Sequence, residues 1–166
     1  MGNDDNDLMK RAAEYWVGGQ PVKAGKLIFE RLPNEYRPKW AARILRLLLE
    51  KGGVQSPLFD RVLDTVENQA LWGDGHRVFS TIRAEALKLD EIQRTQGLNQ
   101  DQKLRASLLS VAELVAKVTY NATTPPDEFD QDSGWWIAAC LRGFVDHRWK
   151  DEGFSTAAWT VLFDQQ

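Results

Sequence analysis

The chain has 166 residues, 43% of them apolar, a length and composition that suit one globular domain. Its 24 acidic and 21 basic side chains leave a net charge of −3. This slightly negative net charge argues against general nucleic-acid binding, which requires a basic surface.

The first part of the chain predicts two helices behind an acidic tail. Residues 1–7, MGNDDND, are polar, and we expect a flexible tail there, followed by a single α-helical domain over residues 8–166. The first helix is expected over residues 8–17, because Gly18-Gly19 interrupts the pattern. The second is expected over residues 21–32, because its proline suits a first helical turn and its apolar residues have the spacing of a buried stripe.

Four more helices are expected between clear boundaries. One over residues 38–51 begins at a proline and ends at two glycines, and one over residues 57–69 follows a Ser-Pro start. Two long helices are expected over residues 76–95 and 99–120, the second with the capping-box pattern of Asn99 and Gln102. Its segment from Leu104 to Val118 is apolar on most sides, which is typical of a helix in the centre of a bundle.

The last part of the chain predicts a seventh helix over residues 133–147 and a short helix over residues 155–163, for which an extended TVLF segment is the alternative. Strand patterns are nearly absent from the sequence. The predicted fold class is therefore all-α, a single-domain irregular bundle of seven to eight helices. We expect the burial of Trp40, Phe79 and either Trp135 or Trp136 to dominate its stability.

The segment PPDEFDQDSGWW, residues 125–136, is the strongest candidate for chemistry. It carries four carboxylates, namely Asp127, Glu128, Asp130 and Asp132. A helix-loop-helix calcium site needs a glycine at the sixth position and a glutamate at the twelfth, and counting from Glu128 or Asp130 finds neither. We favour a structural role, in which the prolines end one helix and the acids complement the positive end of the next. A looser carboxylate site, for instance for magnesium, is the alternative.

Two adjacent tryptophans follow the acidic segment. Trp135 and Trp136 would point about 100° apart on a helix, so that one can be buried while the other lies nearer the edge. The edge tryptophan either packs under the acidic segment or anchors a partner. The single cysteine, Cys140, lies in the apolar run WWIAACL and is interpreted as a small buried hydrophobic residue.

The two histidines lack neighbours at metal-ligand spacing. His76 follows Asp74 at a helix start, and His147 lies near a helix end, where a proton would suit the helix dipole. An acid–base pair of His76 with Asp130 is left open, because proximity in the fold cannot be deduced from the sequence.

The absence of strong catalytic motifs from the sequence decides the functional hypothesis. We predict a non-catalytic α-helical protein–protein interaction module, an adaptor or accessory subunit, that needs no cofactor or metal. The alternative is a small-ligand or metal-binding helical protein, or a hydrolase, with a carboxylate site near Asp127–Asp132. The candidate binding residues are Asp127, Glu128, Asp130, Asp132, Trp135, Trp136 and His76.

The expected partner is another protein, with a basic surface that matches the acidic segment. We expect no nucleic-acid or membrane partner, and the oligomeric state is left open. The N-terminus does not resemble a signal peptide, and no apolar run approaches the ~18 residues of a membrane span. We therefore expect a soluble, cytoplasmic protein.

Overall fold

Helices make up almost all of the computed structural model, which describes residues 2–123 and 133–164. These residues contain no strand, and the all-α prediction is confirmed. The helices are α1 (Gly2–Val17), α2 (Pro21–Arg31), α3 (Arg37–Gly52), α4 (Pro57–Glu67), the 3₁₀ helix η1 (Gln69–Asp74), α5 (Gly75–Thr95), α6 (Gln100–Asn121), α7 (Trp136–Gly143), the π-helix η2 (Phe144–Arg148) and α8 (Glu152–Phe163).

Most helix boundaries follow from local chemistry that the sequence already contains. Pro21 and Pro57 occupy the first turns of α2 and α4, where a missing N–H group costs nothing. Gly53 follows α3 with a φ of 61°, a left-handed conformation that favours glycine. The capping box of α6 is confirmed: Gln102 N–H donates to Asn99 Oδ1 at 2.8 Å, and Asn99 N–H donates to Gln102 Oε1 at 3.0 Å.

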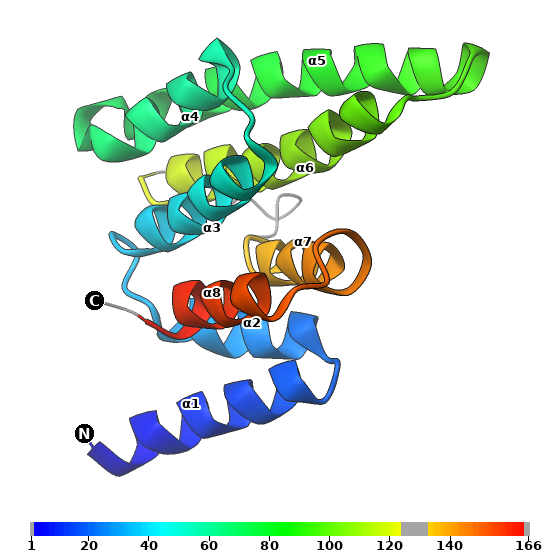
Figure 1. Cartoon of the computed structure of the whole chain (residues 1–166). Coiled ribbons are helices and arrows are strands. Elements are labelled where there is room, and N and C mark those ends of the chain that lie inside the picture. Colours follow the sequence, from blue (N-terminus) through cyan, green and yellow to red (C-terminus); the bar gives the residue numbers. More distant parts are fainter. Residues whose placement is uncertain (1, 124–132, 165–166) are drawn as a thin grey trace.

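The helices form an irregular stack with α6 near its centre. In Figure 1, α1 and α2 lie at one end of the stack and α4 and α5 at the other, with α3 and α6 between them. Helix α6 contacts α3, α4, α5 and α7, and its segment 108–119 is largely buried. The prediction that residues 104–118 occupy the centre is therefore confirmed, and this position leaves one face of α6 to form a site with α7.

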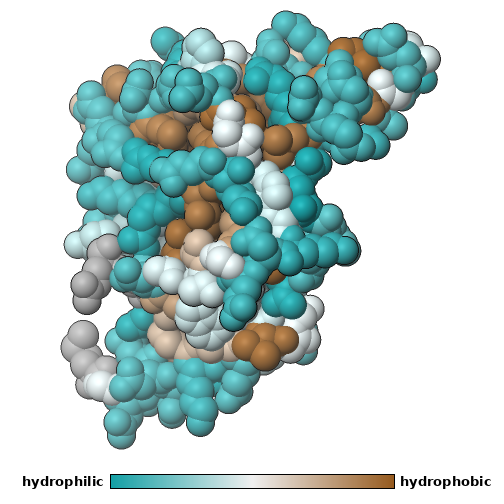
Figure 2. Space-filling model, viewed as in Figure 1, coloured by the Kyte–Doolittle hydropathy of each residue, from teal (hydrophilic) through white to brown (hydrophobic). Residues whose placement is uncertain are grey.

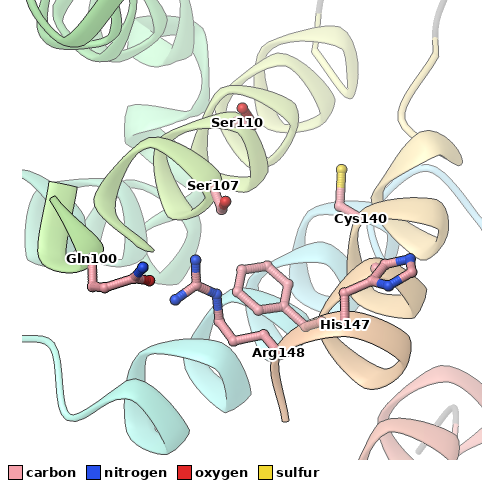
Figure 3. A pocket seen from close by; sticks show the side chains of 8 residues that line it. Gln100, Ser107, Ser110, Cys140, His147 and Arg148 are labelled. Atoms are coloured by element: carbon pink, nitrogen blue, oxygen red, sulfur yellow. The ribbon is translucent and has the colours of Figure 1, made fainter. Parts of the chain in front are cut away.

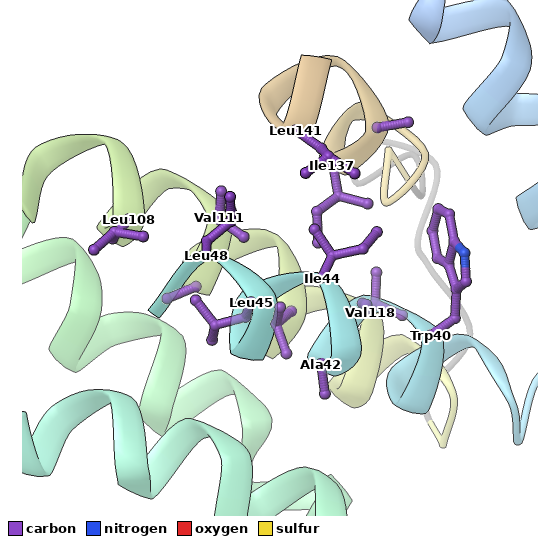
Figure 4. Packing of buried hydrophobic residues seen from close by; sticks show 14 of the residues in the cluster. Trp40, Ala42, Ile44, Leu45, Leu48, Leu108, Val111, Val118, Ile137 and Leu141 are labelled. Atoms are coloured by element: carbon purple, nitrogen blue, oxygen red, sulfur yellow. The ribbon is translucent and has the colours of Figure 1, made fainter. Parts of the chain in front are cut away.

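The core between α3, α6 and α7 is made of aliphatic side chains. Figure 4 shows α3 carrying its apolar face against both other helices. Each such side chain contributes about 1.5–3 kcal/mol when fully buried. The fully buried members are Ile44, Leu45, Leu48, Leu108, Val111, Ile137 and Leu141. This core holds α6 and α7 at a fixed separation.

Residues 2–7, for which we expected a flexible tail, are the beginning of α1. Asp4 and Asp5 lie in the first turn, where negative charge complements the helix dipole. Asp5 also pairs with Arg31 of α2 at 3.2 Å. The hydrogen bond and charge of Arg31 lower the pKa of the Asp5 carboxyl below its usual range. The polar segment is helical through these charge contacts, which an apolar pattern does not reveal.

The expected seventh helix over residues 133–147 is also corrected. Helix α7 covers only Trp136–Gly143, and the chain continues as the π-helix η2. The wider turn is closed by Trp149 N–H, which donates to the Phe144 carbonyl five residues earlier at 2.8 Å. A π-turn shifts the side chains that follow it around the helix axis, and such turns occur often at functional sites.

The expected aromatic core is confirmed only in part. Trp40 is buried at 3% exposure, but Phe79 is half-buried. Of the two adjacent tryptophans, Trp135 is the one that packs inward, edge-on against Phe29 with ring centroids 6.1 Å apart. Trp136 is 49% exposed and therefore does not belong to the core.

The prediction of a helix is correct for the last segment, although α8 begins earlier than expected and runs from Glu152 to Phe163. Asp151 begins α8: its Oδ1 accepts a hydrogen bond from Phe154 N–H at 2.7 Å. Its Oδ2 lies 2.8 Å from Lys51 Nζ at the end of α3. The Lys51 hydrogen bond, and then that of Phe154 N–H, hold the pKa of Asp151 below its usual range.

We expect the stability contributed by Asp151 to depend on pH. Its folded pKa lies below its unfolded value of about 3.9, so the contribution is complete above that value and is lost as the pH falls through the folded pKa. Asp151→Asn keeps a capping oxygen without the charge, and its Tm should fall below that of the wild type at pH 7. The two melting temperatures should converge below about pH 4. A Tm difference between the wild type and Asp151→Asn that stays constant as the pH is lowered would contradict the role of the ion pair. So would a difference of the same size when both chains also carry Lys51→Met.

Candidate functional site

A pocket of about 610 Å³ opens between α6 and the α7–η2 segment. Figure 2 shows the surface hollowed beneath the projecting ends of α5 and α6, on the side of α7. We call this hollow the α6–α7 pocket, and Figure 3 shows its side chains. They are Gln100, Ser107 and Ser110 of α6, Cys140 and Gly143 of α7, and Phe144, His147 and Arg148 of η2.

The α6 side of the pocket is polar although most of this helix is apolar. Ser107 and Ser110 lie three residues apart and therefore on one helix face. Their hydroxyl groups donate to the carbonyls of Lys103 at 3.1 Å and Ala106 at 3.2 Å. These protons are engaged within the helix, and the small side chains leave room between α6 and α7.

The opposite side of the pocket carries the site's permanent charge. The π-turn of η2 places His147 and Arg148 on the lining. The guanidinium of Arg148 points toward Gln100 across the pocket (Figure 3). The Arg148 side chain is half-buried and forms no hydrogen bond or ion pair with any residue in the described part of the chain. A cationic group is therefore left available to a molecule in the pocket.

The thiol in the pocket is a poor nucleophile. Burial raises the pKa of Cys140, which keeps the sulfur protonated at neutral pH, whereas the thiolate is the reactive form. The Cys140 sulfur and the His147 ring also point in different directions in Figure 3. From the sequence Cys140 is interpreted as a small buried hydrophobic residue, but it is only half-buried and lines the pocket.

The exposed tryptophan Trp136 lies beside the pocket. It precedes Cys140 by four residues and Gly143 by seven, spacings that place all three on one face of α7. Trp135 lies on a different face, where Phe29 and Lys26 cover it; the Lys26 Nζ is 5.6 Å from its ring centroid. The structure thus separates the two candidates, Trp135 as a packing residue and Trp136 as a surface residue at the pocket edge.

The candidate His76 lies in another, smaller pocket of about 330 Å³, which Lys117 and Tyr120 also line. Its Nδ1 is 3.0 Å from the Gly73 carbonyl, and its ring centroid is 5.4 Å from that of Tyr120. These contacts hold the imidazole at the start of α5. His76 does not line the α6–α7 pocket.

The four acidic candidates, Asp127, Glu128, Asp130 and Asp132, lie outside the described residues, and so does the acid of the possible His76–Asp130 pair. The carboxylate-site alternative therefore stays a prediction. Across residues 2–123 and 133–164, no cluster of three or more histidines, cysteines and acids is placed to hold a metal ion. Within the same ranges, every helix is too short or too polar to cross a bilayer.

None of the eight lining residues of the α6–α7 pocket is among the sequence-based binding candidates, and Gln100, Ser107, Ser110 and Arg148 are not singled out at all. The two serines within the largely apolar segment 104–118 of α6 are a pattern that could have indicated a cavity. Nothing in the sequence distinguishes Arg148, because its position depends on the π-turn. Comparison of the chain with known protein families, curated proteins and solved structures finds no match. The function of the pocket must therefore be argued from its own residues.

Proposed function

We propose that the protein is a non-catalytic helical interaction module, an adaptor or accessory subunit, that binds a segment of another protein in the α6–α7 pocket. The observation that carries this proposal is a tryptophan, 49% exposed, that lies one turn before Cys140 on the face of α7 lining an open pocket. Tryptophan and arginine are the residues most enriched among those that dominate binding energy at protein interfaces. Trp136 begins α7 and Arg148 ends η2, so the two residues flank the α7–η2 side of the pocket.

The lining chemistry supports binding rather than catalysis. The thiol of Cys140 is protonated, and both serine hydroxyls donate to carbonyls of their own helix. None of the eight lining residues is an acid that could orient His147 as a base. Phe144 in the lining and Trp136 on the same face of α7 as Cys140 offer apolar surface, while Gln100 and Arg148 offer hydrogen-bond donors. This mixture suits a peptide segment with one apolar and one polar anchor.

A cytoplasmic location is part of the proposal, since a single, half-buried free cysteine suits a reducing compartment. A net charge of −3 supports a partner other than nucleic acid. A basic surface on the partner, opposite residues 127–132, stays a prediction. Fluorescence microscopy of the tagged full chain tests the location, and exclusive staining outside the cytoplasm would contradict it.

A random twelve-residue peptide library, selected against the immobilised full chain, tests the binding role of the pocket. Because Cys140 is the single cysteine and lines the pocket, its alkylation rate reports occupancy directly. We expect selected peptides to slow the alkylation of Cys140. Trp136→Ala should weaken their binding by about tenfold or more, or ~1.4 kcal/mol.

Trp159 provides a matched control, since it is 39% exposed on α8 and lines a different hollow with Trp16 and Val17. Trp159→Ala should leave peptide affinity and Cys140 protection unchanged. Peptides that bind without protecting Cys140, and that bind both tryptophan variants equally, would place the interaction elsewhere and reject the pocket.

A further inference from the structure

We infer that the α6–α7 pocket recognises a carboxylate on the bound segment, held by the guanidinium of Arg148 with the Gln100 amide beside it. This inference rests on the proposed function and adds the chemistry of the partner segment. A chain terminus and an aspartate or glutamate side chain supply the same group. Either source presents the same carboxylate group to Arg148.

Arg148 differs from the other partly covered arginines of this chain in its lack of a described partner. The Nε–H group of Arg142 donates to both carboxylate oxygens of Asp146, at 3.1 and 3.0 Å. Arg37 donates from Nε to the carbonyls of Phe29 at 3.0 Å and Leu32 at 3.1 Å.

Arg148 is half-buried as well, yet none of the residues described in the structure accepts from its guanidinium. Its five N–H groups keep their hydrogen-bonding capacity. A partly desolvated cation without an acceptor is unfavourable, and an anionic ligand relieves that cost.

The charges around Arg148 also favour an anionic ligand. The eight lining residues include no carboxylate. Two acids near η2 are engaged elsewhere, Asp146 by Arg142 and Asp151 by Lys51 at 2.8 Å. Gln100 belongs to the first turn of α6, whose positive dipole end adds to the attraction of an anion. The acidic residue of that turn, Asp101, is not part of the lining.

The number of cationic side chains in the pocket favours a carboxylate over a phosphate group. Sites for phosphorylated segments gather several arginines, because the phosphate group carries close to two negative charges. The α6–α7 pocket presents one permanent cation, which matches a carboxylate of single charge. The planar guanidinium can donate two parallel hydrogen bonds to the two carboxylate oxygens, a geometry that lysine cannot reproduce.

The spacing of the two anchors sets the length of the bound segment. Arg148 follows Trp136 by twelve residues, which corresponds to roughly 18 Å along a helix axis. An extended peptide covers that distance in about five or six residues. We therefore expect short binding segments, with an apolar side chain at Trp136 and the carboxylate four to six residues away, by the same estimate.

The test uses peptides selected from the random library and resynthesised in matched forms. One form carries a free C-terminal carboxylate and one a C-terminal amide, and in further forms each Asp or Glu is replaced by Asn or Gln. We expect removal of one carboxylate to weaken binding to the wild type by about tenfold or more, as for a charge-assisted contact. The same removal should have little effect on binding to Arg148→Gln.

Arg148→Lys should recover only part of the lost affinity, since it restores the charge without the planar fork. Arg94→Gln, at an exposed position of α5, is the matched control and should bind like the wild type. Both variants at position 148 should keep the wild-type Tm, because the folded chain offers that side chain no described partner.

The outcomes separate this inference from the proposed function. Peptides that protect Cys140 and require Trp136, but bind equally with and without their carboxylates, would overturn the inference and leave the interaction role intact. If the library yields no binder, the interaction role fails. Glutarate, titrated against the full chain while the Nε–Hε resonance of Arg148 is followed by NMR, then decides the inference. A saturable shift at Arg148 and not at Arg94 supports the carboxylate site, and the absence of a shift overturns it.

Discussion

Replacing Trp40 with alanine should lower the free energy of unfolding by about 3–5 kcal/mol, the range for removing a large aromatic side chain from a core. The Trp40 side chain is 3% exposed, and its ring lies 6.1 Å from that of Phe29 on α2. Its Nε1 donates to the Leu162 carbonyl of α8 at 3.3 Å. One side chain of α3 thus contacts both neighbouring helices, and alanine would leave a cavity where they meet. Urea denaturation followed by far-ultraviolet circular dichroism measures the loss.

The surface tryptophan provides the internal comparison for this measurement. Trp136→Ala should change the free energy of unfolding by less than about 1 kcal/mol, because the side chain is 49% exposed and its removal leaves no cavity. The same variant should reduce peptide affinity. Similar losses of stability in Trp40→Ala and Trp136→Ala would contradict the assignment of one residue to the core and the other to the surface.

The sequence contains most of the information that defines this fold. Local patterns with a direct physical cause gave correct elements, as in the capping box at Asn99 and the central position of the 104–118 segment. Predictions failed where contacts between residues far apart in the sequence determine the local structure. The first turns of α1 are accompanied by the ion pair of Asp5 with Arg31, a residue from the next helix.

The candidate site was much harder to predict than the fold. Its two sides come from residues 100–110 and 140–148, which only the packing of α6 against α7 brings together. The exposed position of Trp136 could be foreseen as one of two options, but the sequence could not choose between it and Trp135. Arg148 depends on a π-turn, whose extra residue per turn has no pattern in a single sequence.

The close contact of α2 with α7 leads to the second large effect on stability. A Cβ atom at Gly25 of α2 would lie 2.5 Å from the Trp135 carbonyl oxygen and 2.6 Å from Ala138 Cβ. The carbonyl is part of the backbone and cannot rotate away, so the two helices would have to separate. Gly25→Ala should therefore carry an overpacking penalty near 3 kcal/mol. The gain of about 1 kcal/mol in helix propensity reduces the net loss to about 2 kcal/mol.

Gly143 at the end of α7 is the matched control, because a Cβ atom there meets no heavy atom within 4 Å. Its backbone has φ −58° and ψ −41°, which alanine adopts readily. Gly143→Ala should raise the free energy of unfolding by about 0.4–1 kcal/mol, since alanine loses less backbone freedom on folding. The same substitution thus has opposite signs at the two glycines, and urea denaturation measures both. If Gly25→Ala also stabilises the protein, α2 and α7 do not approach at Gly25. The orientation of the Trp136 face beside the pocket depends on that approach.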